Sequence, residues 1–190
     1  MISIMFTVIE THLRDIRSRV VTLAAGQYLF HAGDPVRDLF VTRRGGVHLV
    51  RHQPDGSVLV LQRGGPGSIV AEASVYSDSY HCDGVAWDQR DAARAGDTQV
   101  VAFARTDIVR HLRENADFAD AWARHLAHEL QRVRMLAEIL SIRTVAKRLD
   151  AWMAWRNGEC PRRGDWHAVA SEIGVSPEAL YRELARRRHA

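Results

Sequence analysis

The longest regular pattern of apolar and polar positions lies between Asp117 and Ile142, a stretch without Gly or Pro. Its many Ala, Leu, Arg and Glu residues favour a helix, and at about 1.5 Å per residue the helix would be about 39 Å long. Along one face, apolar residues recur at alternating spacings of four and three, at Ala119, Ala123, Leu126, Leu130, Val133, Ala137 and Leu140.

A repeat of about 3.5 residues is what two helices need in order to wind together. The pattern therefore predicts a dimer seam made by Leu126, Leu130, Val133, Ala137 and Leu140. The alternative is an ordinary amphipathic helix in the core of a monomer. A second stripe beside the first, at Trp122, Leu136 and Ile139, predicts that the helix also packs on its own chain.

Before this helix, from about Val20 to Val75, short apolar runs alternate with Gly, Pro and Asp. The runs are RVVTL, QYLFHA, DLFVTR, VHLVRH, SVLVLQR and SIVAEA. Strands of this length and spacing are typical of an all-β sandwich or barrel, and Asp55-Gly56 predicts a hairpin turn. QVVAFAR predicts a last strand, and Thr106 a cap for a short helix. Residues 76–99 are polar, with a mobile loop expected at 88–96.

After the long helix, Val145, Leu149, Trp152 and Met153 share one helical face. Asp165 is placed to cap a further helix that ends at Gly174, and Ser176 to cap a last helix that opens with Pro177. This is the pattern of a helix-turn-helix. Leu180 and Leu184 form the apolar face of the last helix, and the residues that point elsewhere are Ala179, Tyr181, Arg182, Arg186, Arg187 and Arg188.

The outward residues of that helix suit a DNA major groove. Arg182 is able to pair with guanine, and Glu178 to accept from a cytosine amino group. Arg186, Arg187 and the residues after them are able to meet phosphate. The alternative is a plain pair of helices with a solvated charged face.

Charge and composition sharpen this interpretation. From Ser141 onward there are ten Lys and Arg against six Asp and Glu, a net charge of +4, whereas the preceding residues have a net charge of −1. The excess positive charge favours contact with a polyanion at the C-terminal end. Two distant cysteines, Cys82 and Cys160, predict neither a disulfide framework nor a four-ligand metal site, so a reducing cytoplasm is expected. No apolar run approaches a membrane span, and we find no catalytic motif that predicts an enzyme.

The order of these motifs resembles the cyclic-AMP receptor protein and fumarate-nitrate regulator family of bacterial transcription regulators. The resemblance spans about Val20 to Arg186. It is carried by segments at 24–26, 29–34, 46–47, 54–56 and 65–67, by Asp38-Leu39-Phe40-Val41, by the long helix, and by Ser176, Glu178 and Arg182 in the last helix. It implies an α+β protein: an N-terminal β-roll of the cyclic-nucleotide-binding jelly-roll type (1–115), a dimerisation helix (116–142) and a DNA-binding helix-turn-helix (143–190).

The sequence departs from this family in the effector pocket. Members that bind cyclic nucleotide have Gly-Glu, and about ten residues later Arg followed by Ser or Thr; here these positions hold Ala71-Glu72 and Cys82-Asp83. A lost charged pair and an added like charge each cost about 1–3 kcal/mol. Together they predict binding about 100-fold weaker than a micromolar site, so cyclic AMP is disfavoured as the effector. Arg90 or Arg94 is able in principle to supply the missing cation.

Haem or an iron–sulfur cluster is also disfavoured, because a cluster needs about four Cys and a lone His81-Cys82 pair is more often polar surface. Family members usually continue into a β-hairpin wing, whereas this sequence ends at Ala190. That end predicts weaker DNA binding, or the sequence is a truncated fragment. The expected function is a homodimeric DNA-binding transcription regulator, with double-stranded DNA, a second copy of the chain and RNA polymerase as candidate partners. The alternative is a dimeric interaction module that has lost its ligand and does not read DNA.

Overall fold

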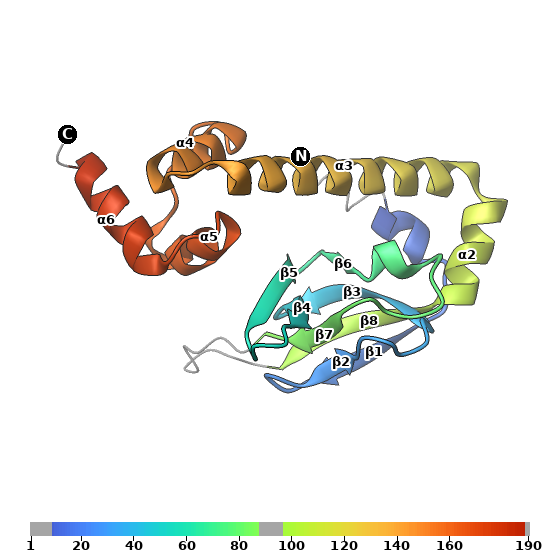
Figure 1. Cartoon of the computed structure of the whole chain (residues 1–190). Helices are drawn as coiled ribbons and strands as arrows, with labels where there is room; N and C mark the ends of the chain where they lie inside the picture. Colours follow the sequence, from blue (N-terminus) through green and yellow to red (C-terminus); the bar gives the residue numbers. More distant parts are fainter. Residues whose placement is uncertain (1–8, 88–96, 189–190) are drawn as a thin grey trace. The chain divides into compact units, whose positions relative to one another are not determined.

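The computed structural model describes residues 9–87 and 97–188. The chain divides into two compact units (Figure 1), which we call the β-roll unit, Met1–Leu126, and the C-terminal unit, Ala127–Ala190. The boundary falls within the long helix α3, Ala116–Ser141, so each unit contains part of that helix.

The β-roll unit is built from two antiparallel sheets of four strands each, in a jelly-roll-like arrangement (Figure 1). One sheet has the order β1-β8-β3-β6, with β1 at Ser18–Leu23, β8 at Thr98–Ala104, β3 at Asp38–Arg44 and β6 at Ile69–Val70. The other has the order β2-β7-β4-β5, with β2 at Tyr28–Phe30, β7 at Asp83–Ala86, β4 at Val47–His52 and β5 at Val58–Gly64.

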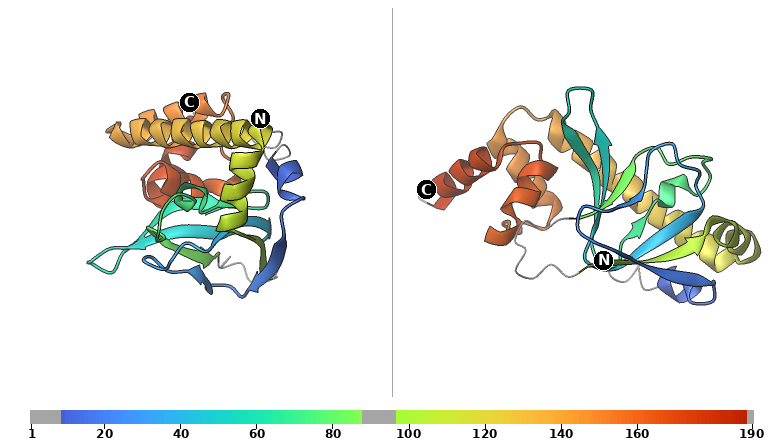
Figure 2. Two further views of the ribbon diagram at one scale, coloured as in Figure 1. Left: turned by 90° about the vertical axis from the view of Figure 1, so that its right-hand side faces the viewer. Right: turned by 90° about the horizontal axis from the view of Figure 1, so that it is seen from below.

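Local sequence explains most of these strands. The predicted hairpin at Asp55-Gly56 is confirmed: β4 pairs with β5 in antiparallel fashion, and Gly56 has a φ of +82°, which a residue without Cβ adopts at little cost. Figure 2 shows this hairpin as a two-stranded extension of the sheet. The run SIVAEA was predicted as one strand, but only Ile69–Val70 is a strand, followed by the short 3-10 helix η1 at Glu72–Ser74.

One strand was not predicted. Residues 83–86, DGVA, lie in the region interpreted as polar, yet they form β7 by pairing with both β2 and β4. Gly84 is needed there, because a Cβ at this position would lie 2.7 Å from the ring of Phe30. The loop predicted at 88–96 lies outside the described residues.

Two apolar clusters fill the β-roll unit. One lies between the sheets and includes Phe30, Phe40, Val47, Tyr80 and Cys82. The other joins the first sheet to helix α2, Arg105–Glu114, and to the first turns of α3, through Ile108, Leu112, Phe118 and Trp122. Thr106 was predicted to cap α2, but the helix already begins at Arg105 with Ala104 as its capping residue, because β8 leads into the helix without a break.

The C-terminal unit contains four further elements around its own core (Figure 1). They are α4 at Val145–Trp155, the short 3-10 helix η2 at Arg163–Asp165, α5 at Trp166–Glu172 and α6 at Pro177–Arg188. The buried residues include Ile139 of α3, Leu149 and Trp152 of α4, Ile173, and Leu180 and Leu184 of α6. Between α4 and α5 the described residues form η2 and no strand.

Capping predictions in this unit can be checked directly. Ser176 precedes α6 as predicted, and its Oγ accepts a hydrogen bond from the Ala179 amide at 3.2 Å. Asp165 precedes α5 as predicted, but its side chain makes no capping hydrogen bond. Gly174 follows α5 with a φ of +65°, in the region that favours Gly.

Candidate effector site and nucleic-acid interface

The candidate effector site begins where β6 ends. Ala71 is buried and has a φ of 70° and a ψ of 21°, which is the left-handed conformation. For a residue with a Cβ this conformation costs about 1–2 kcal/mol, which explains why a glycine is favoured at this position. The chain keeps the turn although the glycine is replaced, so Glu72 still begins η1 with its side chain buried.

Cys82 lies beside this turn in the structure. Its side chain is buried in the same apolar cluster as Ala71, and burial is the main cause that raises the pKa of its thiol. A nearby arginine, Arg51, acts in the opposite direction, and the acidic side chains of Asp83 and Glu72 act in the same direction as burial. The buried thiol is therefore neutral at neutral pH and a poor nucleophile.

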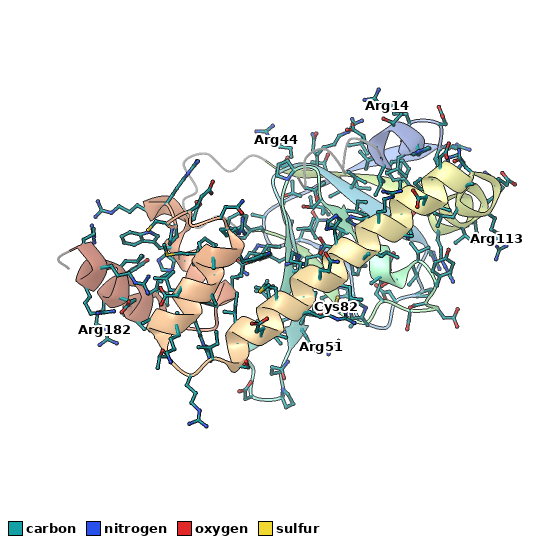
Figure 3. All side chains as sticks on the ribbon, turned by 90° about the horizontal axis from the view of Figure 1, so that it is seen from above. Arg14, Arg44, Arg51, Cys82, Arg113 and Arg182 are labelled. Carbon is teal, nitrogen blue, oxygen red and sulfur yellow. The ribbon has the colours of Figure 1, made fainter. Side chains whose placement is uncertain are left out.

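Arg51 was not among the predicted site residues. It lies on β4 next to Val50, which pairs with Asp83 of β7, and its Nη2 donates to the His81 carbonyl at 2.9 Å. Its charge also acts on the thiol of Cys82, and both residues are labelled in Figure 3. The strand register could have indicated this neighbour, but β7 itself was not predicted. Arg90 and Arg94, the predicted alternatives, lie outside the described residues.

Asp83 has a different environment from that expected. Its carboxylate accepts a hydrogen bond from the Ala32 amide at 2.9 Å and lies 3.3 Å from Nδ1 of His31 and 3.8 Å from Nε2 of His52. Adjacent residues in an extended chain point to opposite sides, so Cys82 enters the core while Asp83 faces these groups. The structure thus brings Ala71, Glu72 and Cys82 together and turns the carboxylate of Asp83 toward His31 and His52.

The described residues hold no group of three or more His, Cys, Asp or Glu side chains that is arranged to bind a metal ion. Both cysteines are free, Cys82 in the core and Cys160 at the surface. Among the described helices, none has both the length and the apolar character of a membrane span.

The predicted seam of α3 differs in exposure from the other large apolar residues of the helix. Phe118, Trp122 and Ile139 are buried within the units to which they belong. In contrast, Leu130, Val133 and Leu140 are 50%, 54% and 45% exposed, and Ala137 is also exposed. Leu126 is half-buried against the core of the β-roll unit. The predicted second stripe is buried at Trp122 and Ile139 and half-buried at Leu136.

The candidate nucleic-acid interface lies on α6. Arg182 is exposed and projects from the helix (Figure 3), and Glu178 is exposed near the helix start. The pKa of Glu178 is lowered, first by a hydrogen bond from its own backbone N–H and then by Ser176. Tyr181 is half-buried, with its ring 5.1 Å from that of Trp166 and 5.8 Å from that of His167.

The other arginines of α6 have partners within the C-terminal unit. Arg186 pairs with Glu183 at 2.8 Å and stays mostly exposed. Arg187 pairs with both Glu183 and Asp150 at 2.7 Å and donates to the Ala146 carbonyl at 2.9 Å. Arg187 therefore holds α6 against α4.

Comparison with known proteins adds to this geometry. The cyclic nucleotide-binding domain family matches residues 20–115. The chain belongs to this family. The match covers both sheets and α2, and with the solved structures below it confirms the resemblance that the sequence indicated, at the level of domain family and fold. No curated protein sequence matches the chain.

Solved structures extend the similarity beyond this domain. FixK2 from Bradyrhizobium japonicum shares 14% identity at a TM-score of 0.71, over 92% of this chain and 86% of that one. The regulator CLP of Xanthomonas campestris shares 18% identity at a TM-score of 0.62, over 96% and 91%. The catabolite activator protein of Thermus thermophilus shares 22% identity at a TM-score of 0.53, over 96% and 83%. These similarities show a common fold.

Proposed function

We propose that the protein is a homodimeric DNA-binding transcription regulator whose cyclic nucleotide-binding domain responds to an effector other than cyclic AMP. The observation that carries this proposal is the contrast on α6 between the buried Leu180 and Leu184 and the exposed Arg182 and Glu178. A helix with this division docks on its own unit by one face and offers base-reading groups on the other.

Dimerisation is supported by the exposed face of α3. Leu130, Val133 and Leu140 follow the 3.5-residue repeat, and all three are exposed in a single copy. Large apolar residues exposed at this regular spacing are what a second helix buries. We assign the seam to Leu126, Leu130, Val133, Ala137 and Leu140 of two copies, and the domain boundaries that the sequence predicted stay part of this proposal.

DNA contact is assigned to the surface of α6 and its first turn. We expect Arg182 to read a base edge, Glu178 and Ser176 to lie at the groove, and Arg186 to meet phosphate. Ala179 and Tyr181 stay in the predicted interface as van der Waals contacts. Because Arg187 pairs with Glu183 and Asp150, we expect it to orient α6 more than to bind phosphate.

The proposed choice of effector follows from the residues of the candidate effector site. Cys82 is neutral and buried where cyclic nucleotide-binding members have Arg, so the pocket lacks the charged partner of a cyclic phosphate. CLP is described as responsive to cyclic di-GMP, so this fold serves more than one effector. The mechanism we propose is a population shift, in which an effector changes the relative orientation of two α6 helices. RNA polymerase as a partner stays a prediction.

A binding experiment separates this function from the alternative, a dimeric interaction module without DNA binding. Genomic fragments selected with the purified chain are titrated across a salt series, beside random duplex. A regulator binds selected fragments tightly, with affinity that falls steeply as salt rises. Near-zero binding to every fragment at low salt would favour the interaction module.

The variant Arg182→Ala sharpens this test. If Arg182 pairs with a base, its loss costs about 1–3 kcal/mol on the selected site and little on random DNA. Arg162→Ala, an exposed position in the segment before η2, is the matched control for loss of one positive charge. An equal loss on both kinds of DNA would show that Arg182 touches only the DNA backbone.

A further inference from the structure

Arg148, whose side chain donates to four backbone carbonyls, lies outside the predicted DNA interface. We propose that Arg148 of α4 is a positioning residue that fastens the turn between α5 and α6 to the C-terminal end of α3. Helix α6 would then follow a rotation of helix α3. This inference rests on the proposed function, since it gives Arg148 a role in how the two recognition helices are presented to DNA.

The side chain of Arg148 donates to four backbone carbonyls. On one side, its Nε donates to the Ile142 carbonyl at 2.6 Å and its Nη2 to the Leu140 carbonyl at 2.9 Å. On the other side, its Nη1 donates to the carbonyls of Ile173 at 3.0 Å and Gly174 at 2.7 Å. All of these groups lie within the C-terminal unit.

These carbonyls are the ones that most need a donor. The last carbonyls of a helix have no partner inside the helix and carry the negative end of its dipole. Leu140 and Ile142 lie at the end of α3, and Ile173 and Gly174 at the end of α5. One guanidinium therefore joins two helix ends, which its five donors in a rigid plane allow and a lysine ammonium does not.

Gly174 provides a second contact at the same place. A Cβ at this position would lie 2.5 Å from Cδ2 of Leu140 and 3.2 Å from Nη1 of Arg148. The turn therefore packs directly against the last apolar residue of the predicted seam. A shift of the α3 end reaches the turn through packing as well as through hydrogen bonds.

The connection continues from the turn to α6. Val175 and Ser176 lead directly into this helix, and Arg187 holds α6 to α4 through Asp150 and the Ala146 carbonyl. The end of α3, α4, the turn and α6 are thus joined by directional polar contacts in addition to the apolar core. Such contacts fix an orientation, whereas apolar packing tolerates small rotations.

The test compares the full-length wild type with Arg148→Lys, Arg148→Gln and the matched control Lys147→Gln, which removes an exposed charge one residue away. Sedimentation first establishes that each variant is a dimer, and circular dichroism that it is folded. Affinity is then measured for a selected two-half-site duplex and for a duplex with one half-site. Hydrogen exchange is followed at the amides of residues 173–176.

We expect both Arg148 variants to stay dimeric and to bind one half-site within about threefold of wild type. Their affinity for the two-half-site duplex should fall about 10-fold or more, because two loosely held helices no longer match both half-sites. Amides of the turn should exchange faster, with Arg148→Lys between wild type and Arg148→Gln. Lys147→Gln should match wild type in both readouts.

An equal loss on one and two half-sites, or full two-site affinity with a faster-exchanging turn, would overturn the positioning role. Hydrogen exchange also separates this inference from the function on which it rests. If the wild type binds no DNA, the proposed function is refuted, whereas faster exchange of the turn amides in Arg148→Lys would still support the fastening of the turn. Unchanged exchange in both Arg148 variants would refute the fastening of the turn itself, whatever the DNA result.

Discussion

The two compact units use their charged side chains in different ways. Around the candidate effector site of the β-roll unit, charged groups have partners within the unit or are buried in it. Asp83 accepts from the Ala32 amide, Arg51 donates to the His81 carbonyl, and Glu72 is buried. In the C-terminal unit, Arg148 and Arg187 also turn inward, but Arg182 is exposed and makes no hydrogen bond within the described residues.

This difference separates what a fold requires from what a ligand requires. The β-roll needs the turn at Ala71 and the pairing of β7, and both are present although the sequence at Ala71 and Cys82 departs from the pattern expected of members that bind cyclic nucleotide. A surface that binds a polyanion would need outward charge, and Arg182 and Arg186 of α6 are exposed. Membership of the domain family therefore predicts the architecture of the β-roll unit better than its ligand.

The largest effect is expected at the seam that the sequence predicts on α3. Leu130→Asp would place two carboxylates in an apolar contact, and their desolvation costs several kcal/mol. We expect the dissociation constant of the dimer, measured by sedimentation, to rise about 100-fold or more. Binding to a two-half-site duplex should be lost with it.

Gln131→Asp is the matched control, since residue 131 is exposed on the same helix and lies outside the stripe. It introduces the same charge one position away and should leave the dimer intact. A Leu130→Asp protein that sediments as a dimer would place the seam elsewhere.

The long helix could be predicted from sequence because its signals are local. Composition and a regular repeat give its existence and its extent to within one residue, and the exposed Leu130 and Val133 fit the predicted face. The strand β7 could not be predicted in this way. Its sequence, DGVA, has little preference for a strand, and it forms because β2 and β4 lie on either side.

The candidate effector site shows the same limit. The unusual residues Ala71, Cys82 and Asp83 could be found in the sequence, but their directions could not. Asp83 faces His31 and His52, which come from other parts of the chain, and Arg51 approaches Cys82 only through the pairing of β4 with β7. Arg148 was missed because its four partners are backbone carbonyls at helix ends, and no side-chain pattern in the sequence marks them.

A second prediction concerns the ligand of the β-roll unit. Cys82 supplies no charge for a phosphate. The dissociation constant for cyclic AMP should therefore be about 100-fold higher, or more, than that of a micromolar site. Calorimetric titration is the direct measurement. The triple variant Ala71→Gly, Cys82→Arg and Asp83→Ser, which restores the pattern of cyclic nucleotide-binding members, should bind cyclic AMP at least about 10-fold more tightly than wild type.

Micromolar binding of cyclic AMP by the wild type would contradict this prediction. Arg51 would then be the cation to examine, since its charge lowers the pKa of Cys82 and it therefore lies near this thiol. Loss of binding in Arg51→Ala would show that β4 supplies the charge that β7 lacks, and the contrast between the two units would then narrow.

The smallest expected effect is a pH dependence confined to the β-roll unit. His48 lies opposite Arg63 on β5, and its ring stacks on Trp87 at 5.1 Å. Burial, and secondly Arg63, lower the pKa of His48 from 6.5 to about 4. Its buried Nε2 has no hydrogen-bond partner among the described residues.

The sign of the pH effect follows from this lowered pKa. At His48 the unfolded chain takes up a proton below about pH 6.5, whereas the folded chain does so only near pH 4. The free energy of unfolding therefore decreases as the pH is lowered from about 6.5 to about 4. Because part of the ring is exposed, we expect a loss of about 1–2 kcal/mol, less than the full shift implies. Urea unfolding of the β-roll unit, followed through Trp fluorescence at several pH values, measures this loss.

His48→Gln is the matched control, because glutamine has no charge to gain over this range. As the pH falls from 6.5 to 4, the free energy of unfolding of the wild type should decrease relative to that of His48→Gln. Below pH 4 the difference between the two proteins should stay constant. A constant difference from pH 7 to pH 4 would mean that His48 is protonated as easily in the folded chain as in the unfolded one. The β-roll unit would then accommodate a positive charge on His48 beside Arg63. In this respect it would no longer differ from the C-terminal unit, where α6 has exposed positive charge.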